Sequence, residues 1–180
     1  MKYYLYNSLA NNGIRPEVKD GIEFVDAVGI DYRDYLSGLQ PEDEVVLVGG
    51  DGTLNYFANA VKGMELKNNI YLLGCGTGND FLTDIKRKPG EEVQVNKYLD
   101  NLPTVYVNDL EQVFINNMGF GIDGYCCEVA DQIKEKTPNK KINYSGIAIK
   151  GLLFHFKPCH AEIIVDGVKH EFDNVWIPPP

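Results

Sequence analysis

Two short apolar runs, each followed directly by a glycine-rich turn, constrain the fold of this chain more than any other feature. A short continuous apolar run is typical of a strand that is buried on both faces of a sheet. Helical spacing begins at Leu54 after the first turn and runs to Lys62, with Gly63 as a stop signal. Strand, turn and helix in this order predict a parallel α/β sheet. The runs and their turns are Glu44–Val48 with Gly49–Thr53, and Ile70–Leu73 with Gly74–Phe81.

The segments that precede these runs extend the same pattern. Lys2–Asn7 and Ile22–Ala27 have the composition of strands. Asp31 is a candidate N-cap for a short helix, whose apolar face would carry Tyr32, Tyr35, Leu36 and Leu39. We therefore expect residues 1–102 to form a Rossmann-like α/β domain.

The pattern changes after the basic segment Lys86–Gly90. A short helix at Asn96–Asn101 is followed by two candidate hairpins, and the second turns at Asp166-Gly167, a pair that suits a two-residue turn. Locally paired strands predict a second, mainly antiparallel domain over residues 103–180. Its expected strands are 104–108, 111–116, 161–165 and 168–172, and its expected helices are 125–136 and 144–156.

Charge and composition exclude several classes of protein. The chain has 17 Lys and Arg against 26 Asp and Glu, which gives a net charge of −9. Nucleic-acid binding is not expected, because it requires clustered basic residues. No apolar run reaches the roughly 18 residues of a membrane span. The four cysteines form no CxxC pair, which favours reduced thiols and argues against a zinc site.

The first glycine turn suits an anion. Glycine allows a close backbone approach, and the free N–H groups at a helix start favour negative charge. The turn lacks the lysine of a P-loop, and its carboxylate, Asp51, would need a metal or a hydroxyl beside a phosphate. Asp51 is thus a candidate Mg²⁺ ligand. The alternative is a tight turn in which Asp51 or Thr53 only caps the helix.

The second turn offers a hydroxyl from Thr77, an amide from Asn79 and a carboxylate from Asp80. In a parallel sheet both turns lie at the carboxyl ends of their strands, where open α/β folds bind ligands. We expect the two turns to face one crevice.

These motifs together resemble the diacylglycerol kinase catalytic-domain family. Gly49-Gly50-Asp51-Gly52-Thr53 with Asn55 is similar to its nucleotide signature, and Gly76–Phe81 is similar to a second signature that separates lipid kinases from NAD kinases. Phe114–Asp123 resembles the stretch that opens the family's β-rich second domain. The wider group includes sphingosine kinases, NAD kinases and phosphofructokinases.

The resemblance implies roles for individual residues. Asp51 and Asp80 would be catalytic, and Asp51 would also handle Mg²⁺. Asn79 and Asp80 would shape the place where the acceptor hydroxyl arrives. The residues expected to bind ATP are Asn7, Gly49, Gly50, Gly52, Thr53, Asn55, Gly76, Thr77 and Asn79.

Three departures from the family pattern stand out. Asn7 is followed by Ser8 where the family has proline, and Arg15–Lys19 replaces most of the expected first helix. The family also continues well beyond the position of Pro180. We therefore expect a fragment that is inactive by itself and that lacks the general base.

The expected function is transfer of the ATP γ-phosphate to a primary hydroxyl of a diacylglycerol-like lipid. The expected location is cytoplasmic and peripheral to the membrane, and a homodimer stays open. An apolar set on 144–156 (Tyr144, Ile147, Ile149, Leu152, Leu153 and Phe156) either lines a lipid groove or packs a core, and nearby lysines face either a membrane or solvent. The alternative functions are a kinase for NAD or a sugar phosphate, and a nucleotide- or lipid-binding protein without catalysis.

Overall fold

The computed structural model describes residues 1–9, 22–76, 79–137 and 142–177. Their contacts divide the chain into two compact units, Met1–Asn117 and Met118–Pro180. The domain boundary expected after residue 102 stays a prediction, and by contacts alone the segment up to Asn117 groups with the first unit.

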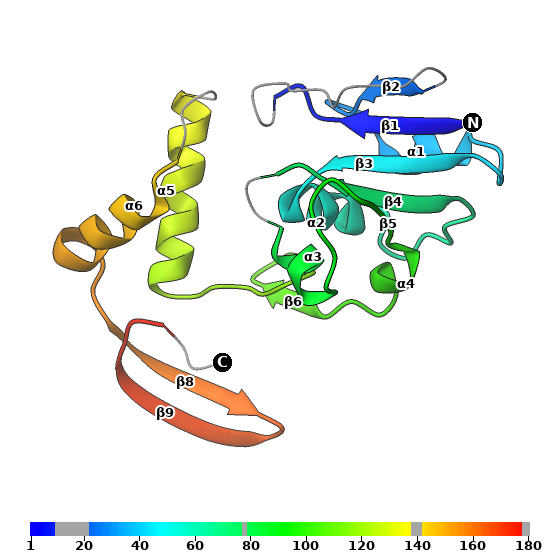
Figure 1. Ribbon diagram of the computed structural model, residues 1–180. Coiled ribbons are helices and arrows are strands. Elements are labelled where there is room, and N and C mark those ends of the chain that lie inside the picture. The colour runs from blue at the N-terminus through cyan, green and yellow to red at the C-terminus, as the bar shows by residue number, and fades with distance from the viewer. Residues whose placement is uncertain (10–21, 77–78, 138–141, 178–180) are drawn as a thin grey trace. The chain divides into compact units, whose positions relative to one another are not determined.

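A five-stranded sheet organises the first unit (Figure 1). Its order is β2-β1-β3-β4-β5; the first four strands are parallel and β5 is antiparallel at the edge. The expected mostly parallel α/β sheet is thus confirmed. The strands are β1 (Lys2–Tyr6), β2 (Glu23–Asp26), β3 (Glu44–Gly49), β4 (Asn69–Gly74) and β5 (Glu92–Gln94).

The main core lies between one face of this sheet and the helices of the first unit. Leu5, Val45 and Leu47 on the strands meet Leu54 and Phe57 of α2, and all are at most 1% exposed. Their strand neighbours on the opposite face form a second, smaller cluster. Both faces of β3 are therefore buried, as its continuous apolar run predicts. The helices are α1 (Tyr32–Ser37), α2 (Asp51–Ala60), α3 (Asp80–Asp84) and α4 (Asn96–Leu99).

Edge strand β5 has no counterpart in the sequence analysis. It is only three residues long, with one partly buried apolar side chain at Val93, so its pattern carries little signal. Side chains on β1 hold it from across the sheet: Lys2 Nζ lies 2.5 Å from Glu92 Oε2, and Tyr4 donates to Glu92 Oε1. Burial and this bond raise the pKa of Tyr4 to about 12. The edge strand is thus fixed by tertiary contacts.

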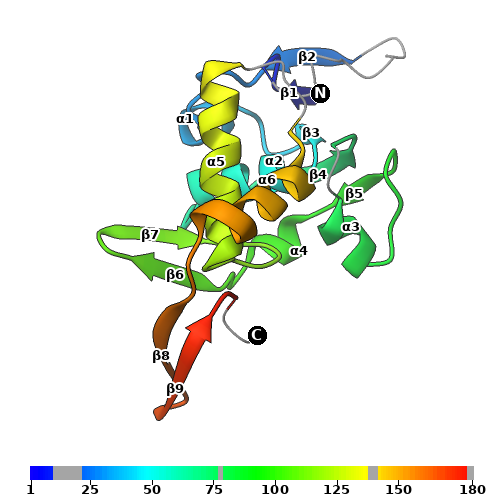
Figure 2. The same cartoon turned by 90° about the vertical axis from the view of Figure 1, so that its left-hand side faces the viewer.

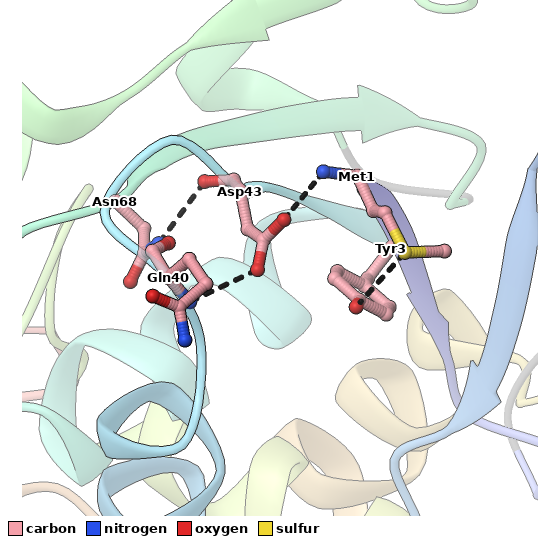
Figure 3. Close-up of polar contacts among 5 residues, drawn as sticks. All are labelled: Met1, Tyr3, Gln40, Asp43 and Asn68. Atoms are coloured by element: carbon pink, nitrogen blue, oxygen red, sulfur yellow. Dashed lines mark hydrogen bonds and ion pairs between the residues drawn. The ribbon is translucent and has the colours of Figure 1, made fainter.

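A polar cluster closes the amino-terminal edge of the sheet (Figure 3). Asp43 pairs with the α-ammonium group of Met1, and its Oδ2 accepts the backbone N–H of Gln40 at 2.9 Å. Asn68 donates through Nδ2 to the carbonyl oxygens of Gln40 and Asp43, at 2.7 and 3.0 Å. These bonds satisfy two buried polar residues, Asp43 and Asn68, at the start of β3 and β4.

The first unit ends in a hairpin, β6 (Thr104–Val107) and β7 (Leu110–Val113), whose strands lie side by side in Figure 2. The expected hairpin is confirmed, but the predicted strands 104–108 and 111–116 imply a turn at residues 109 and 110, one residue later than the structure has it. Leu110 already belongs to β7, and the turn uses Asn108, whose φ of 52° is left-handed.

The second unit contains helices and one long hairpin. Its elements are α5 (Ile122–Lys136), α6 (Tyr144–Lys150), the π-helix η2 (Gly151–His155), β8 (Cys159–Val165) and β9 (Val168–Val175). The turn residues Asp166 and Gly167 have φ values of 51° and 81°, as the expected two-residue turn requires. Among the described residues, no helix combines the length and apolarity needed to cross a bilayer.

Candidate functional site

The two glycine turns leave the sheet side by side. Gly49, at the end of β3, is in register with Gly74, at the end of β4, and Cys75 N donates to Gly49 O at 2.9 Å. The parallel pairing of β3 and β4 therefore places both turns at the same carboxyl edge. The first turn is shorter than expected, because α2 begins at Asp51 and the cap is Gly50.

Asp51 joins the two turns. Its Oδ2 accepts the backbone N–H of Asp80 at 2.9 Å, and its Oδ1 accepts that of Phe81 at 3.0 Å. A carboxylate on the first turn of α2 thus caps the start of α3, where peptide N–H groups lack partners within the helix. These bonds confirm that the turns lie together. The capping alternative for Asp51 also has a structural basis, although the capped helix is α3 and not α2.

Close packing explains two of the glycines. A Cβ on Gly49 would stand 2.0 Å from Thr53 Oγ1, and a Cβ on Gly74 would stand 2.4 Å from a methyl group of Leu82. Gly52 differs, since a Cβ there would meet nothing within 4 Å. Gly49 and Gly74 therefore serve the packing of the turns, whereas Gly52 leaves open space beside the first turn of α2.

Two buried side-chain oxygens among the described residues have no hydrogen-bond partner, and both belong to this site. They are Asn55 Oδ1 on α2 and Asn79 Oδ1 at the start of α3. Asn79 Nδ2 donates to Gly76 O at 2.9 Å, which fixes the orientation of that amide and leaves its oxygen as the acceptor. Because a buried orphan acceptor is costly, both oxygens are suited to a hydroxyl, an ammonium or a metal cation.

The donors fit a phosphate with Mg²⁺. The first N–H groups of α2 suit phosphate oxygens, which accept but do not donate. Each oxygen of Asp51 keeps a second lone pair beside its bond to α3, so this carboxylate could still contact a cation. Within the described ranges, no group of three or more His, Cys, Asp or Glu side chains is arranged so that it could hold a metal ion. Mg²⁺ usually needs only one or two carboxylates when phosphates supply its other ligands.

The remaining candidates lie at the same edge or outside the described residues. Asn7 follows β1, the neighbour of β3, and is exposed; its Oδ1 accepts Leu9 N at 2.8 Å and so closes a turn. Asp80 is the exposed first residue of α3. Thr77 lies outside the described residues. The contributions of all these residues to binding stay predictions.

Sequence reasoning missed Arg33, which holds the far end of α2. Its Nε donates to Ala60 O at 2.9 Å, and its Nη2 donates to Lys62 O. A guanidinium at the C-terminal end of a helix also complements the helix dipole. An exposed arginine on a short helix gives no signal for this role in the sequence.

A hollow of about 420 Å³ lies elsewhere in the first unit, along β5 and α4. Its lining mixes basic and acidic side chains and includes none of the candidate residues of the two turns. The hollow therefore adds nothing to the site described above. The lining residues are Arg87, Glu91, Glu92, Val93, Gln94, Asn96, Lys97 and Tyr98.

Comparison with known families agrees with this geometry. Residues 28–105, which contain both turns, match the family model described as the diacylglycerol kinase catalytic domain. This segment of the chain is thus similar to the diacylglycerol kinase catalytic domain. Both turns that Asp51 joins lie within the matched segment.

Curated staphylococcal relatives carry the name "Putative lipid kinase". The protein of Staphylococcus epidermidis is 28% identical over 135 residues, which cover 72% of this chain and 42% of the relative. The protein of Staphylococcus aureus strain MRSA252 is 26% identical over 130 residues (69% and 40%), and that of Staphylococcus haemolyticus 27% over 129 residues (69% and 40%). The chain thus spans about two fifths of the length of these relatives.

Proposed function

We propose that the natural full-length protein is an ATP-dependent lipid kinase that phosphorylates a primary hydroxyl of a diacylglycerol-like lipid. The observation that carries this proposal is the bidentate link from Asp51 to Asp80 and Phe81, which unites both family signatures in one site. The match of residues 28–105 to the diacylglycerol kinase catalytic domain supports a kinase, and the names of the relatives favour a lipid acceptor.

In this proposal the first turn of α2 holds the nucleotide. The N–H groups of Asp51, Gly52 and Thr53 bind phosphate oxygens, and the open space beside Gly52 admits them. Bound Mg²⁺ would neutralise charge on the phosphates, with Asp51 as its protein ligand. The orphan oxygens of Asn55 and Asn79 accept hydroxyl or water protons.

In this proposal the acceptor hydroxyl binds at the start of α3. Asp80 and Asn79 form its first residue and its cap, next to Asp51. We propose that they fix the acceptor hydroxyl in line with the γ-phosphate, because positioning supplies much of the catalysis in phosphoryl transfer. Asp51 and Asp80 are the proposed catalytic pair of this part of the chain.

The test is transfer of radiolabelled phosphate from ATP to diacylglycerol in mixed micelles by the natural full-length protein. Asp51→Ala should lower turnover by at least about a hundredfold while the circular dichroism spectrum stays folded. A second variant, Asp51→Asn, keeps a hydrogen-bond acceptor for the start of α3. It therefore separates loss of the negative charge from loss of the helix cap. The matched control is Asp100→Asn, which makes the same substitution at an exposed aspartate outside the site. Near-normal turnover in both Asp51 variants would remove Asp51 from the mechanism.

A second arm of the same assay offers other acceptors, namely NAD and a sugar phosphate. A lipid kinase should label diacylglycerol and neither of these compounds. Labelling of NAD or the sugar phosphate alone would overturn the lipid assignment but leave the kinase. Calorimetric binding of Mg·ATP without transfer to any acceptor would overturn the kinase and favour a binding protein.

The second unit supports a peripheral position at a membrane. Residues 136–161 contain five lysines and no acidic residue, in a chain of net charge −9. Next to Lys150, the side chains of Leu153 and Phe154 are 67% and 75% exposed. Apolar and basic side chains together suit an anionic bilayer surface.

Vesicle sedimentation tests this location. The protein should sediment with vesicles that contain phosphatidylglycerol and less with pure phosphatidylcholine. Lys150→Glu should weaken the partition about tenfold or more, since each lysine contributes about 1 kcal/mol. Lys67→Glu, an exposed charge reversal in the first unit, is the control, and equal losses in both variants would argue against a local surface. Formation of a homodimer stays a prediction, which light scattering can test.

A further inference from the structure

Asn59, in the last turn of α2, binds the backbone of a strand from a distant part of the chain. Its Oδ1 accepts Val113 N at 2.9 Å, and its Nδ2 donates to Val113 O at 2.8 Å. The same Nδ2 also donates to Asn55 O at 2.9 Å. A side-chain amide has the geometry of a peptide group, so Asn59 pairs with Val113 as a neighbouring strand would.

Val113 needs such a partner because of its place in the β6–β7 ladder. It faces Thr104, and the bond next to this pair runs from Phe114 N to Pro103 O at 3.1 Å. In an antiparallel ladder the N–H and C=O of Val113 then point away from β6. Val113 is only 6% exposed, so water cannot easily supply hydrogen bonds to these two groups. Asn59 satisfies both groups.

A second contact gives the direction of β7 along α2. Lys62, after Asn59 in the chain, forms an ion pair with Glu111, before Val113. Strand and helix therefore run in opposite directions, and the chain after Val113 runs toward the end of α2 that carries the first glycine turn. Ile115 packs against the main core, and the first unit ends at Asn117. The Asn59–Val113 pair thus sets where the chain leaves the first unit relative to that turn.

We propose that Asn59 is a positioning residue that couples the nucleotide turn of α2 to strand β7. This inference rests on the proposed function, since it assumes that ATP binds at the first turn of α2. Nucleotide binding further restrains the first turn of α2, and the amide clamp carries that restraint to Val113 and to the segment that leads into the second unit. Asn59 itself contacts no substrate and acts through α2 and β7.

Amide hydrogen exchange of the natural full-length protein tests the clamp without any activity. In nucleotide-free protein, Asn59→Ala should speed exchange of the Val113 N–H by about tenfold or more, because this N–H loses its acceptor. Lys62→Ala removes the neighbouring ion pair and should leave that rate within about twofold. Unchanged exchange at Val113 in Asn59→Ala would overturn the clamp. If that variant does not fold, Asn59→Leu replaces it, since leucine has the same branching as asparagine and offers the Val113 N–H no acceptor.

The coupling is tested by adding Mg·ATP. In the wild type, exchange should slow at Gly52 and Thr53 and also at Val113. In Asn59→Ala, the protection of Gly52 and Thr53 should remain and that of Val113 should vanish. Equal protection of Val113 in both proteins would overturn the coupling, as would its absence in the wild type when Gly52 is protected. Absence of protection at Gly52 and Thr53 in the wild type would instead overturn nucleotide binding at α2, on which the coupling depends.

Turnover separates positioning from simple stability. Asn59→Ala should lower kcat about tenfold, while the Kd for ATP changes by less than about threefold. Lys62→Ala should change neither constant by more than about twofold. A fall in thermal stability with an unchanged kcat would reduce Asn59 to a structural residue.

Discussion

The two units bury their apolar residues to very different extents. In the first unit, Val45, Val46 and Leu47 are completely buried, although their side chains lie on opposite faces of the sheet. In the second unit, Ile122, Ala130 and Ile147 are the main buried apolar side chains, whereas Phe154 and Ile164 are 75% and 64% exposed. Every described candidate residue of the site belongs to the unit with the filled core.

The difference follows from architecture. Five hydrogen-bonded strands with helices can enclose a core within one hundred or so residues, whereas a two-stranded hairpin such as β8–β9 encloses nothing by itself and is marginal in water. A preorganised phosphate site requires rigid supports. The first unit supplies them, and the second unit offers exposed apolar and basic surface.

The largest expected effect is the contrast between Phe57→Ala and Phe154→Ala. Phe57 is completely buried, so its truncation should lower the free energy of unfolding by about 3–5 kcal/mol. Phe154 is mostly exposed and should change it by less than about 0.5 kcal/mol. Urea unfolding can follow the units separately, because Trp176 is the single tryptophan and lies in the second unit. Equal losses would mean that both units are packed alike in solution.

Glycines in close contact with their neighbours should give similar losses of stability in both units, unlike the two phenylalanines. Gly49→Ala should cost about 2 kcal/mol in the first unit, because its Cβ overlaps Thr53. Gly121→Ala should cost as much in the second unit, because its φ is +67° and its Cβ would stand 2.2 Å from the Trp176 carbonyl oxygen.

Gly52→Ala is the control for this pair. It lies in open space within a helix and should stabilise the protein by about 0.5 kcal/mol. Thermal unfolding monitored by circular dichroism and by tryptophan fluorescence gives these values. A neutral Gly121→Ala would show that the start of α5 is loosely packed.

Helix caps allow the same interaction to be compared in both units. Asp31 accepts the N–H groups of Arg33 and Asp34 at the start of α1, and Asn143 accepts that of Gly146 at the start of α6. Replacement of either residue by alanine should cost about 1 kcal/mol. If the units unfold independently, only Asn143→Ala should shift the fluorescence transition of Trp176. A shift in that transition with Asp31→Ala would show that the units unfold together.

The smallest expected effect is on how the stability of each unit depends on pH, and the two units should respond in opposite directions. Hydrogen bonds from the Met1 ammonium and from Gln40 N lower the pKa of Asp43 below its ordinary 3.8. The contribution of Asp43 to the free energy of unfolding is therefore present above pH 3.8. It is lost as the pH falls through the lowered pKa. The hydrogen bond to Asp173 raises the pKa of His160 above 6.5, so its contribution is present below 6.5 and lost as the pH rises through the raised value.

Unfolding free energies at a series of pH values test both signs. Asp43→Asn should flatten the acid side of the profile for the first unit. His160→Gln should flatten the neutral side for the second unit, as followed by Trp176 fluorescence. A profile of His160→Gln that matches the wild type would show that this exposed pair contributes nothing measurable.

Much of the fold follows from local patterns in the sequence. The apolar runs at β3 and β4, the Asp31 cap of α1 and the Asp166-Gly167 turn need only their own residues, and the structure contains all of them. The two glycine turns were recognisable for the same reason. Strand β5 and the exact start of α2 were not, because a three-residue strand and a helix that begins at Asp51-Gly52 have weak local preferences.

The sequence by itself determined the parallel sheet, the long hairpin and the resemblance to the diacylglycerol kinase catalytic domain, because periodicity, turn residues and short motifs act over a few neighbouring positions. Only the tertiary structure decided that Asp51 binds the start of α3 and that Asn59 binds Val113. These bonds join residues 29 and 54 positions apart, and the register of the strands and the packing of α2 bring them together. An aspartate and an asparagine have many possible partners, and folding selects the one whose donors and acceptors would otherwise be buried without a bond.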